Sequence, residues 1–183
     1  MLIKRGGVKL GNWILNCLKS ENNSTLVVLM CGVAGSGKTT FSKKLEAEGF
    51  VRLSIDEEVW STYGRYGVDY PPEKYGEYLE ESHKRIRNKL IKLTQENRKI
   101  VLDSSFWSRA ERDEYKQLTE ENGGKWKLIY LKVDANELRR RLKIRSERFD
   151  ANAAFPITEE ILSSFLEGFE EPEGEGEIVI ENY

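Results

Sequence analysis

The most constraining feature of this sequence is a glycine-rich loop between an apolar run and a helix-forming run. The loop fits the phosphate-binding pattern G-x-x-x-x-G-K-[ST] and reads Gly32-Val33-Ala34-Gly35-Ser36-Gly37-Lys38-Thr39. The apolar, β-branched run 26–31 before it is typical of a buried parallel strand. The residues after it, 40–48, favour a helix that ends at Gly49. Strand, loop and helix in this order favour a phosphate-binding site over an ordinary glycine turn.

Each part of the loop has a predicted chemical role. Glycines let backbone N–H groups converge on phosphate oxygens, and the start of the next helix adds the positive end of a dipole. Lys38 is expected to reach the outer phosphates, and the Thr39 hydroxyl is expected to ligate Mg²⁺. We therefore predict that residues 32–39 and the adjacent Thr40 bind a nucleoside triphosphate together with Mg²⁺.

Strand-like and helix-like segments alternate along the chain, which is typical of a parallel sheet with crossover helices. The expected strands are 26–31, 51–55, 100–102, 127–133 and 177–181, and the expected helices are 11–20, 40–48, 73–97, 108–122, 135–148 and 158–167. The 183 residues fit one α/β domain. Its expected parts are an N-terminal helix and link over 1–24, a core over 26–133, a lid region over about 135–157, and a C-terminal helix and last strand over 158–183.

Composition narrows the class of protein. A net charge of −2 gives no basic surface for a long nucleic acid, although a short 5′ end held in a local pocket is compatible with it. We interpret the two cysteines, Cys17 and Cys31, as reduced and buried thiols of a cytoplasmic protein. Neither a signal-peptide pattern nor a run of membrane-spanning length is visible. We expect a monomer or a small homo-oligomer that does not associate with membranes.

Two aspartates each end a predicted strand, and in open α/β sheets ligands bind beyond the carboxyl ends of the strands. Asp103 follows an apolar strand and is expected to support Mg²⁺, with a turn or helix cap as the alternative. Asp56 follows another strand and is expected to accept the proton of an attacking hydroxyl. Its alternative role is the N-cap of the helix that follows. Glu57 and Glu58 are interpreted as solvated charges of the first turn.

An arginine-rich helix is predicted after the fourth strand, where a lid over the phosphates would lie. Arg141, Arg145 and Arg148 fall at i, i+4 and i+7 and therefore share one face. An arginine over a phosphoryl group stabilises the charge of the transition state. We expect Arg141 and Arg145 to do so, and Arg139 and Arg140 to lie at the surface. The alternative is a helix whose arginines are only solvated.

Aromatic residues are frequent where a second substrate would bind, between Asp56 and the segment after Asp103. Such side chains stack on a base, an aromatic ring or a sugar face, and equally often belong to the core. The candidates are Trp60, Tyr63, Tyr66, Tyr70, Phe106 and Trp107. We select Tyr63 and Trp107 as substrate-binding residues.

Two arginines after the third strand, Arg109 and Arg112, are candidates for binding an anionic acceptor. Their alternative role is to pair with the carboxylates of the same helix. The only histidine, His83, is predicted to lie at the surface, among the charges of the long helix.

Four segments together resemble the small P-loop kinases grouped with polynucleotide 5′-hydroxyl kinase, chloramphenicol phosphotransferase and zeta toxin. The segments are Gly32–Thr39, Ser54–Asp56, Ile100–Ser105 with Arg109–Arg112 behind it, and Arg140–Arg145. They cover roughly residues 26–148. The resemblance implies a three-layer α/β/α core with a five-stranded parallel sheet of adenylate-kinase-like order 2-3-1-4-5. It also implies ATP with Mg²⁺ as phosphate donor, a hydroxyl acceptor, Asp56 as base, and Arg141 and Arg145 as lid arginines.

The expected activity is transfer of the γ-phosphoryl group of ATP to a hydroxyl of a small molecule such as a nucleoside, antibiotic or sugar. One alternative is a 5′-hydroxyl polynucleotide kinase. Polynucleotide kinases carry an arginine three residues after the base, where this sequence has Val59. The other alternative is an NTPase switch without a phosphate acceptor. It would need a water-activating glutamate or glutamine beside Asp103, which two serines follow.

Overall fold

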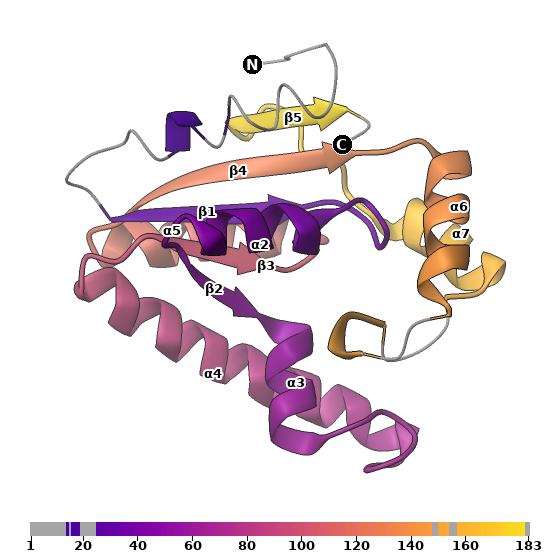
Figure 1. Ribbon diagram of the computed structural model, residues 1–183. Coiled ribbons are helices and arrows are strands. Elements are labelled where there is room, and N and C mark those ends of the chain that lie inside the picture. Colours follow the sequence, from indigo (N-terminus) through magenta and orange to yellow (C-terminus); the bar gives the residue numbers. More distant parts are fainter. Residues whose placement is uncertain (1–13, 15, 19–24, 148–149, 154–156, 182–183) are drawn as a thin grey trace.

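A computed structural model describes residues 14, 16–18, 25–147, 150–153 and 157–181. Its centre is a five-stranded, all-parallel sheet of order β2-β3-β1-β4-β5 (Figure 1). The strands are β1 (Leu26–Cys31), β2 (Val51–Ser54), β3 (Ile100–Asp103), β4 (Lys125–Lys132) and β5 (Glu177–Glu181). The predicted strand order and fold class are confirmed.

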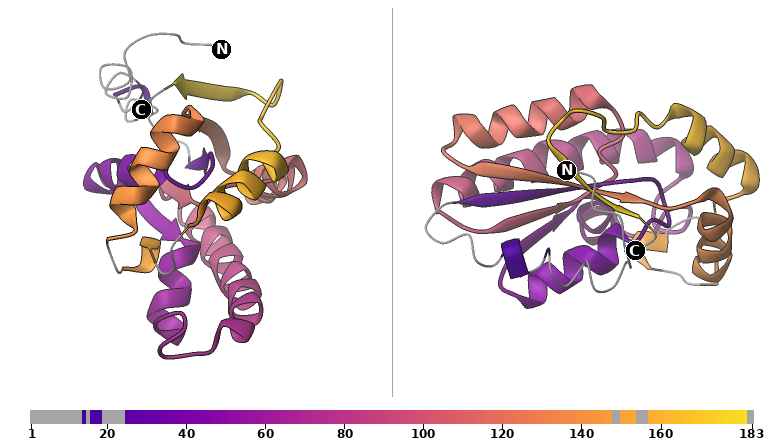
Figure 2. Two further views of the ribbon diagram at one scale, coloured as in Figure 1. Left: turned by 90° about the vertical axis from the view of Figure 1, so that its right-hand side faces the viewer. Right: turned by 90° about the horizontal axis from the view of Figure 1, so that it is seen from above.

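The central strand β1 is buried along its whole length because helices cover both faces of the sheet. It pairs with β3 and β4, with Val27 opposite Ile100 and Leu29 opposite Leu128. Helix α2 packs on one face, whereas α4 and α5 pack on the other (Figure 2). The helices are α2 (Lys38–Ala47), α3 (Ile55–Tyr63), α4 (Tyr75–Gln95), α5 (Arg109–Glu121), α6 (Ala135–Arg145) and α7 (Glu159–Gly168), and the 3₁₀ turns are η1 (Pro72–Lys74) and η2 (Ala151–Ala153).

Side-chain caps fix where several of the helices begin. Ser54 accepts a hydrogen bond from the Glu57 N–H at 3.4 Å and so starts α3 directly at the end of β2. Ser108 accepts from the Glu111 N–H at 3.1 Å, and Asp134 starts α6 in the same way. Because Ser54 already caps the helix, the chain turns from strand to helix within one residue, and Asp56 lies in the first turn.

Most of the expected elements agree with the structure to within one to three residues, and the differences lie at their ends. Ile55 begins α3 rather than ending β2, and the long helix starts at Tyr75 after the turn η1. Of the expected helix 11–20, only Ile14 and residues 16–18 are described, and they are helical. Cys31 is buried, but Cys17 is exposed, which corrects the expectation that both thiols are buried. Arg148, which the spacing places on the same face as Arg141 and Arg145, lies outside the described residues.

All five strands point their carboxyl ends toward the same side of the molecule. Helices α3, α6 and α7 and the turn η2 gather on that side (Figures 1 and 2). The glycine loop and the ends of β2 and β3 lie at this edge as well. Among the described residues, no helix combines the length and the apolarity needed to cross a membrane.

Candidate active site

A cavity of about 890 Å³ opens at the carboxyl edge of the sheet. The start of α2 and the glycine loop form one side of it, and α6, η2 and α7 border it as well. Helices α3, α4 and α5 and the segment after β3 complete its walls. Residues of all these elements therefore converge on one space, which is large enough for a nucleotide or another small ligand.

The glycine loop has the shape that its sequence predicts. Gly32 has φ +141°, and a Cβ there would come within 2.8 Å of the Leu131 carbonyl oxygen and of the Ser36 hydroxyl. Gly37 has φ +103° and forms the N-cap of α2 without any side-chain cap. The first N–H groups of α2 are therefore left for a ligand at the cavity. The loop residues that line the cavity are Ala34, Gly35, Gly37, Lys38, Thr39 and Thr40, whereas Val33 and Ser36 are buried behind them.

Lys38 lies across the loop. Its ammonium donates hydrogen bonds to the carbonyl oxygens of Gly32 at 2.8 Å and Val33 at 3.0 Å. Burial lowers the pKa of Lys38, and the carboxylates of Asp103 and Asp56 partly offset this effect. The two aspartates chosen from the sequence thus act on the same ammonium.

Asp103 is held in a fixed orientation by Thr39 and by Arg52. The Thr39 hydroxyl lies 3.4 Å from Asp103 Oδ1. Arg52 on β2 donates to Asp103 Oδ2 from Nε at 2.9 Å and from a terminal nitrogen at 2.7 Å. Both side chains are only 3% exposed. A charged residue on a buried strand needs a partner of opposite charge, and this was the available signal for Arg52.

Arg52 also connects this pair to α3 and to η2. Its other terminal nitrogen donates to Glu57 at 2.8 Å, and Glu57 accepts from the Asn152 amide at 3.3 Å. Asn152 Oδ1 in turn lies 3.4 Å from the Thr39 hydroxyl. Although burial opposes ionisation of Glu57, the hydrogen bond from Arg52 prevails and lowers its pKa. Glu57 therefore belongs to a closed ring of contacts, although its side chain remains 41% exposed to solvent.

Asp56 faces the cavity from the first turn of α3. Because Ser54 supplies the cap of this helix, the alternative role of Asp56 as N-cap does not apply. Its side chain is exposed to the cavity, and the cavity walls remove part of its hydration. This partial desolvation raises the pKa of Asp56 above the ordinary 3.8, and the nearby Lys38 ammonium opposes the rise. A carboxylate with a raised pKa in a cavity is suited to accept a proton.

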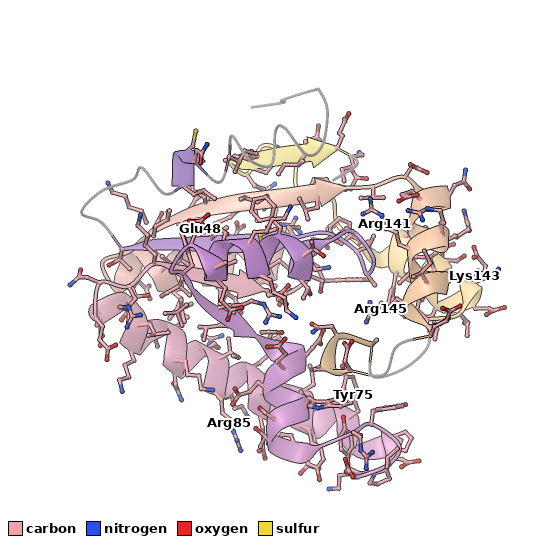
Figure 3. The ribbon with its side chains drawn as sticks, in the orientation of Figure 1. Glu48, Tyr75, Arg85, Arg141, Lys143 and Arg145 are labelled. Atoms are coloured by element: carbon pink, nitrogen blue, oxygen red, sulfur yellow. The ribbon has the colours of Figure 1, made fainter. Side chains whose placement is uncertain are left out.

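Helix α6 places two of its arginines toward the loop. Arg141 donates to Glu137 at 2.7 Å and approaches the carbonyl oxygens of Ser36 and Gly35 at 3.3 and 3.4 Å. Arg145 lines the cavity, and its charge acts on Lys38 and Asp56. Figure 3 shows Arg141 and Arg145 on the side of α6 that faces the sheet.

The outer face of α6 carries the remaining arginines, as expected. Arg140 is 63% exposed and pairs with Glu137, and Arg139 pairs with Glu159 of α7. Lys143 points away from the sheet (Figure 3). On the inner face, Leu142 packs on the loop, so that a Cβ at Gly35 would come within 3.2 Å of it.

The far side of the cavity is formed by aromatic and polar side chains of α4, α5 and the segment after β3. Trp107 lines it and packs edge-on against Phe165 at 5.2 Å between ring centroids. His83 also lines it and is half-buried, which corrects its predicted surface position. His83 lies four residues after Leu79, which also lines the cavity, so the two share one face of α4. This spacing is the sequence signal that could have indicated the position of His83 in the cavity.

Three of the predicted substrate residues do not line this cavity, and two of them lie at the surface. Tyr63 stacks on Tyr78 with ring centroids 3.9 Å apart and hydrogen-bonds to Glu81. Arg109 is 60% exposed and lies beside Asp113. The structure thus places Tyr63 and Arg109 outside the candidate site.

Arg112, the third of these residues, is completely buried and is paired within the fold. Its guanidinium donates to both oxygens of Glu175, at 2.8 and 2.6 Å. It also donates to the carbonyl oxygens of Phe106 at 3.0 Å and Glu170 at 2.8 Å. Phe106 has φ +45°, which is strained for an aromatic residue, and Arg112 helps to hold this turn. Arg112 therefore supports the loop behind the site and is not available to a substrate.

The other aromatic candidates are distributed between core and cavity. Phe106 is buried in the core against Tyr115. Trp60 and Tyr70 line a small second cavity of about 50 Å³, which shares Asp56 with the main one. Tyr66 contacts Tyr70 edge-on.

Solved structures of kinases share this fold at low sequence identity. A candidate kinase from Chloroflexus aurantiacus is 16% identical with a TM-score of 0.69, and the match covers 87% of this chain and 89% of that chain. The APS kinase of Mycobacterium tuberculosis, solved with AMPPNP and APS, is 13% identical with a TM-score of 0.59, with coverage of 87% and 89%. A gluconokinase from Sinorhizobium meliloti is 18% identical with a TM-score of 0.54, with coverage of 86% and 82%.

These likenesses confirm the expected fold of a small P-loop kinase. The family described as AAA domain has a sequence profile that matches residues 27–172, from the first strand to just before the last one. This range covers most of the chain and includes the glycine loop, both aspartates and α6, so the chain belongs to that P-loop family.

Proposed function

We propose that this protein is a phosphotransferase that moves the γ-phosphoryl group of ATP to a hydroxyl group of a small molecule. The observation that carries the proposal is the convergence of Lys38, Asp56 and Arg145 on one cavity bordered by the glycine loop. Phosphoryl transfer requires mainly positioning and charge neutralisation, which these groups supply. The kinase neighbours of the fold support the same reaction class.

The proposed reaction is an in-line displacement. The acceptor oxygen forms a bond to the γ-phosphorus, while the bond from that phosphorus to the bridging oxygen of ADP breaks and ADP leaves with the electron pair. The proton of the acceptor hydroxyl passes to the Asp56 carboxylate. Lys38, Arg141 and Arg145 balance the charge that spreads over the phosphoryl oxygens.

The oxygen donors present fit a hard divalent cation. Thr39 and Asp103 lie within 3.4 Å of each other and would hold Mg²⁺ together with phosphate oxygens, where the ion would neutralise phosphate charge. Arg52 fixes the orientation of the Asp103 carboxylate for this role.

The test is an acceptor screen with ATP and Mg²⁺, using the native protein and two variants. Asp56→Asn is expected to bind ATP as the native protein does but to lose transfer by about 10²–10⁴-fold, because the proton acceptor is gone. Glu58→Gln is the matched control, since Glu58 lies on the same helix and pairs with Lys89 of α4. Full transfer by Asp56→Asn would reject its role as base. Rapid ATP hydrolysis with no phosphorylated product would favour the NTPase alternative.

A further inference from the structure

We propose that the acceptor is an alcohol without an anionic group, neutral or cationic, that presents a ring or another flat apolar face. This inference rests on the proposed phosphotransferase function and narrows its substrate class. It follows from the distribution of charge around the cavity, from the rigid aromatic wall, and from the positions of the arginines that do not line it.

The cavity has two sides of different charge. All of its lysines and arginines come from α2 and α6, which are the elements of the glycine loop and the lid; they are Lys38, Lys43, Lys44, Arg141 and Arg145. The side formed by α3, α4, α5 and the segment after β3 contributes two carboxylates, Asp56 and Glu111. Among the described residues of that side, no lysine or arginine lines the cavity. The anionic triphosphate therefore suits one side, and the other side repels anions.

His83 adds no positive charge to this side of the cavity. It is half-buried on α4, and the charged groups that act on it are Glu111, Arg87 and Asp56. Burial lowers the pKa of His83 below its ordinary value of 6.5, which keeps the imidazole neutral at physiological pH. A neutral imidazole offers one donor and one acceptor for a hydroxyl group.

The apolar part of this wall is rigid and flat. Trp107 is held between Phe165 and Phe169, with ring centroids at 5.2 and 5.9 Å. Its backbone N–H donates to Glu111 at 2.9 Å, which fixes the start of the segment that carries the ring. Leu79 lies on the same wall. Aromatic and aliphatic surfaces at fixed positions favour a ligand with a ring face.

Arginines close to this wall in sequence or in space are engaged elsewhere. Arg52 is 3% exposed and bound to Asp103 and Glu57, and Arg112 is buried against Glu175. Arg109 lies at the surface beside Asp113 and does not line the cavity. An anionic acceptor would thus meet the carboxylates of Asp56 and Glu111 on this wall. The cations that act on Asp56 are Lys38 and Arg145, which belong to the elements of the phosphate side.

The first experiment compares matched acceptors that differ by one anionic group, with ATP and Mg²⁺ held constant. Suitable pairs are adenosine with 3′-AMP and glucose with glucose 1-phosphate, since both members of each pair keep the same rings. For each pair that is phosphorylated, we expect kcat/KM to be at least about 10-fold higher for the uncharged member, because like charges repel at this wall. A preference for the anionic member, with transfer intact, would overturn the inference and leave the proposed function standing.

A second experiment works even while the acceptor is unidentified. A small-molecule extract is separated on an anion exchanger, and both fractions are incubated with the protein and γ-labelled ATP. Transfer of label to the unretained fraction is the expected result. Transfer only to the retained fraction would overturn the inference. Transfer to neither fraction, with ATP binding intact, would reject the proposed function itself.

Variants at position 83 test whether the charge of this cavity wall causes the preference for uncharged acceptors. His83→Lys adds a cation and is expected to reduce the preference for the uncharged acceptor by about 10-fold or more in the same assay. His83→Gln is the matched control, since it changes the side chain without adding charge, and it should retain the native preference. Equal selectivity in His83→Lys and the native protein would contradict the electrostatic origin of the preference.

Discussion

At the scale of single residues, the candidate site shifts the pKa values of an acid and a base so that the neutral form of each is favoured. Burial raises the pKa of Asp56 and lowers the pKa of Lys38, although each attracts the other. Because the net shift of Asp56 is upward, the folded state binds a proton at this carboxyl more tightly than the unfolded chain does. The ionised Asp56 that the reaction requires therefore weakens the fold.

This shift predicts a pH-dependent gain of stability in Asp56→Asn. Below the ordinary pKa of 3.8 both proteins carry a neutral side chain, so their stabilities are similar. As the pH rises from the ordinary pKa to the raised pKa of the folded state, the native protein loses stability that the variant keeps, and above the raised pKa the difference stays constant. In a chain of this size, each kcal/mol of added stability corresponds to a rise of about 2–4 °C in the melting temperature.

Thermal melting of the two proteins without nucleotide, from pH 5 to 8, measures this difference. The variant should melt higher, and the gap should not narrow as the pH rises. A variant that melts lower at pH 7–8 would mean that the attraction of Asp56 to Lys38 and Arg145 outweighs its burial.

Arg52 offers a second test at this scale, since it is bound to both Asp103 and Glu57. Arg52→Met leaves the buried Asp103 carboxylate without its cation and is expected to cost about 3–5 kcal/mol of folding free energy. Urea unfolding measures this loss. Arg52→Lys keeps the charge without the two parallel hydrogen bonds and should fall between the native protein and the methionine variant.

The matched control is Arg65→Met. Arg65 pairs with Asp69 at 2.9 Å, but the two side chains are 47% and 40% exposed. An exposed pair of this kind contributes about 0–1 kcal/mol, because water screens both charges. If the Arg52 and Arg65 variants lost equal stability, the claimed importance of burial at Arg52 would be wrong.

At the scale of elements, α6 provides the clearest test, because its two faces have different roles. Arg141 approaches the carbonyl oxygens of the loop, whereas Arg140 is 63% exposed on the other face. Both bind Glu137, so that their local environments are otherwise similar. Arg141→Ala is expected to lower kcat by about 10³-fold, because a lid arginine balances charge in the transition state.

Arg140→Ala is the control, and it should leave kcat within about twofold of the native value, as expected for a surface ion pair. Steady-state kinetics at saturating ATP separate the two variants once an acceptor is known. Equal effects of the two substitutions would show that the helix face does not determine the role of these arginines.

Sequence spacing was informative where the relevant contact is local. The spacing of Arg141 and Arg145 placed them on one face of a helix, and the pattern of residues 32–39 predicted the loop between β1 and α2. Contacts between distant segments were not predicted, because they depend on how the elements pack. Asn152 contacts Thr39, which is 113 positions away in the sequence, and Glu57, which is 95 positions away.

The same reason explains the error at Arg112. In sequence it is a charge in the first turn of a helix, which is usually solvated or near a ligand. Its partner Glu175 is 63 positions away, in an acidic and turn-rich segment that carried no signal of burial. Only the packing of this segment against α5 and the turn at Phe106 shows that Arg112 is structural.

At the scale of the whole molecule, β1 is the central strand of the sheet and β5 is an edge strand. β5 is attached to the fold in two ways, by its pairing with β4 and by contacts of the preceding segment with α5. β5 pairs with β4 at the sheet edge, with Ile129 opposite Ile178. The segment before it is attached to α5 through Glu175, which binds Arg112 and also Lys116 at 3.0 Å. This buried ion pair therefore connects the edge strand to the helix layer behind the site.

The pair predicts opposite outcomes for single and double substitutions. Arg112→Met leaves Glu175 buried with only Lys116 as a partner and is expected to cost about 3–5 kcal/mol of folding free energy. The double variant Arg112→Met with Glu175→Met removes both charges and replaces them with side chains of similar volume. It should recover most of the loss, since buried pairs are often replaceable by apolar residues at little cost. Lys116 keeps Asp113 at 3.0 Å as its partner in that protein.

Urea unfolding of the native protein and the two variants decides between a stability role and a site role. If Arg112 acts only through the fold, the double variant should regain both folding free energy and transfer activity. If the double variant is stable but inactive, Arg112 positions the turn at Phe106 through hydrogen bonds that methionine does not replace. Loss of stability in the double variant equal to that in the single one would contradict the ion-pair argument. In that case the hydrogen bonds to the Phe106 and Glu170 carbonyl oxygens, rather than the paired charges, hold the edge strand against the core.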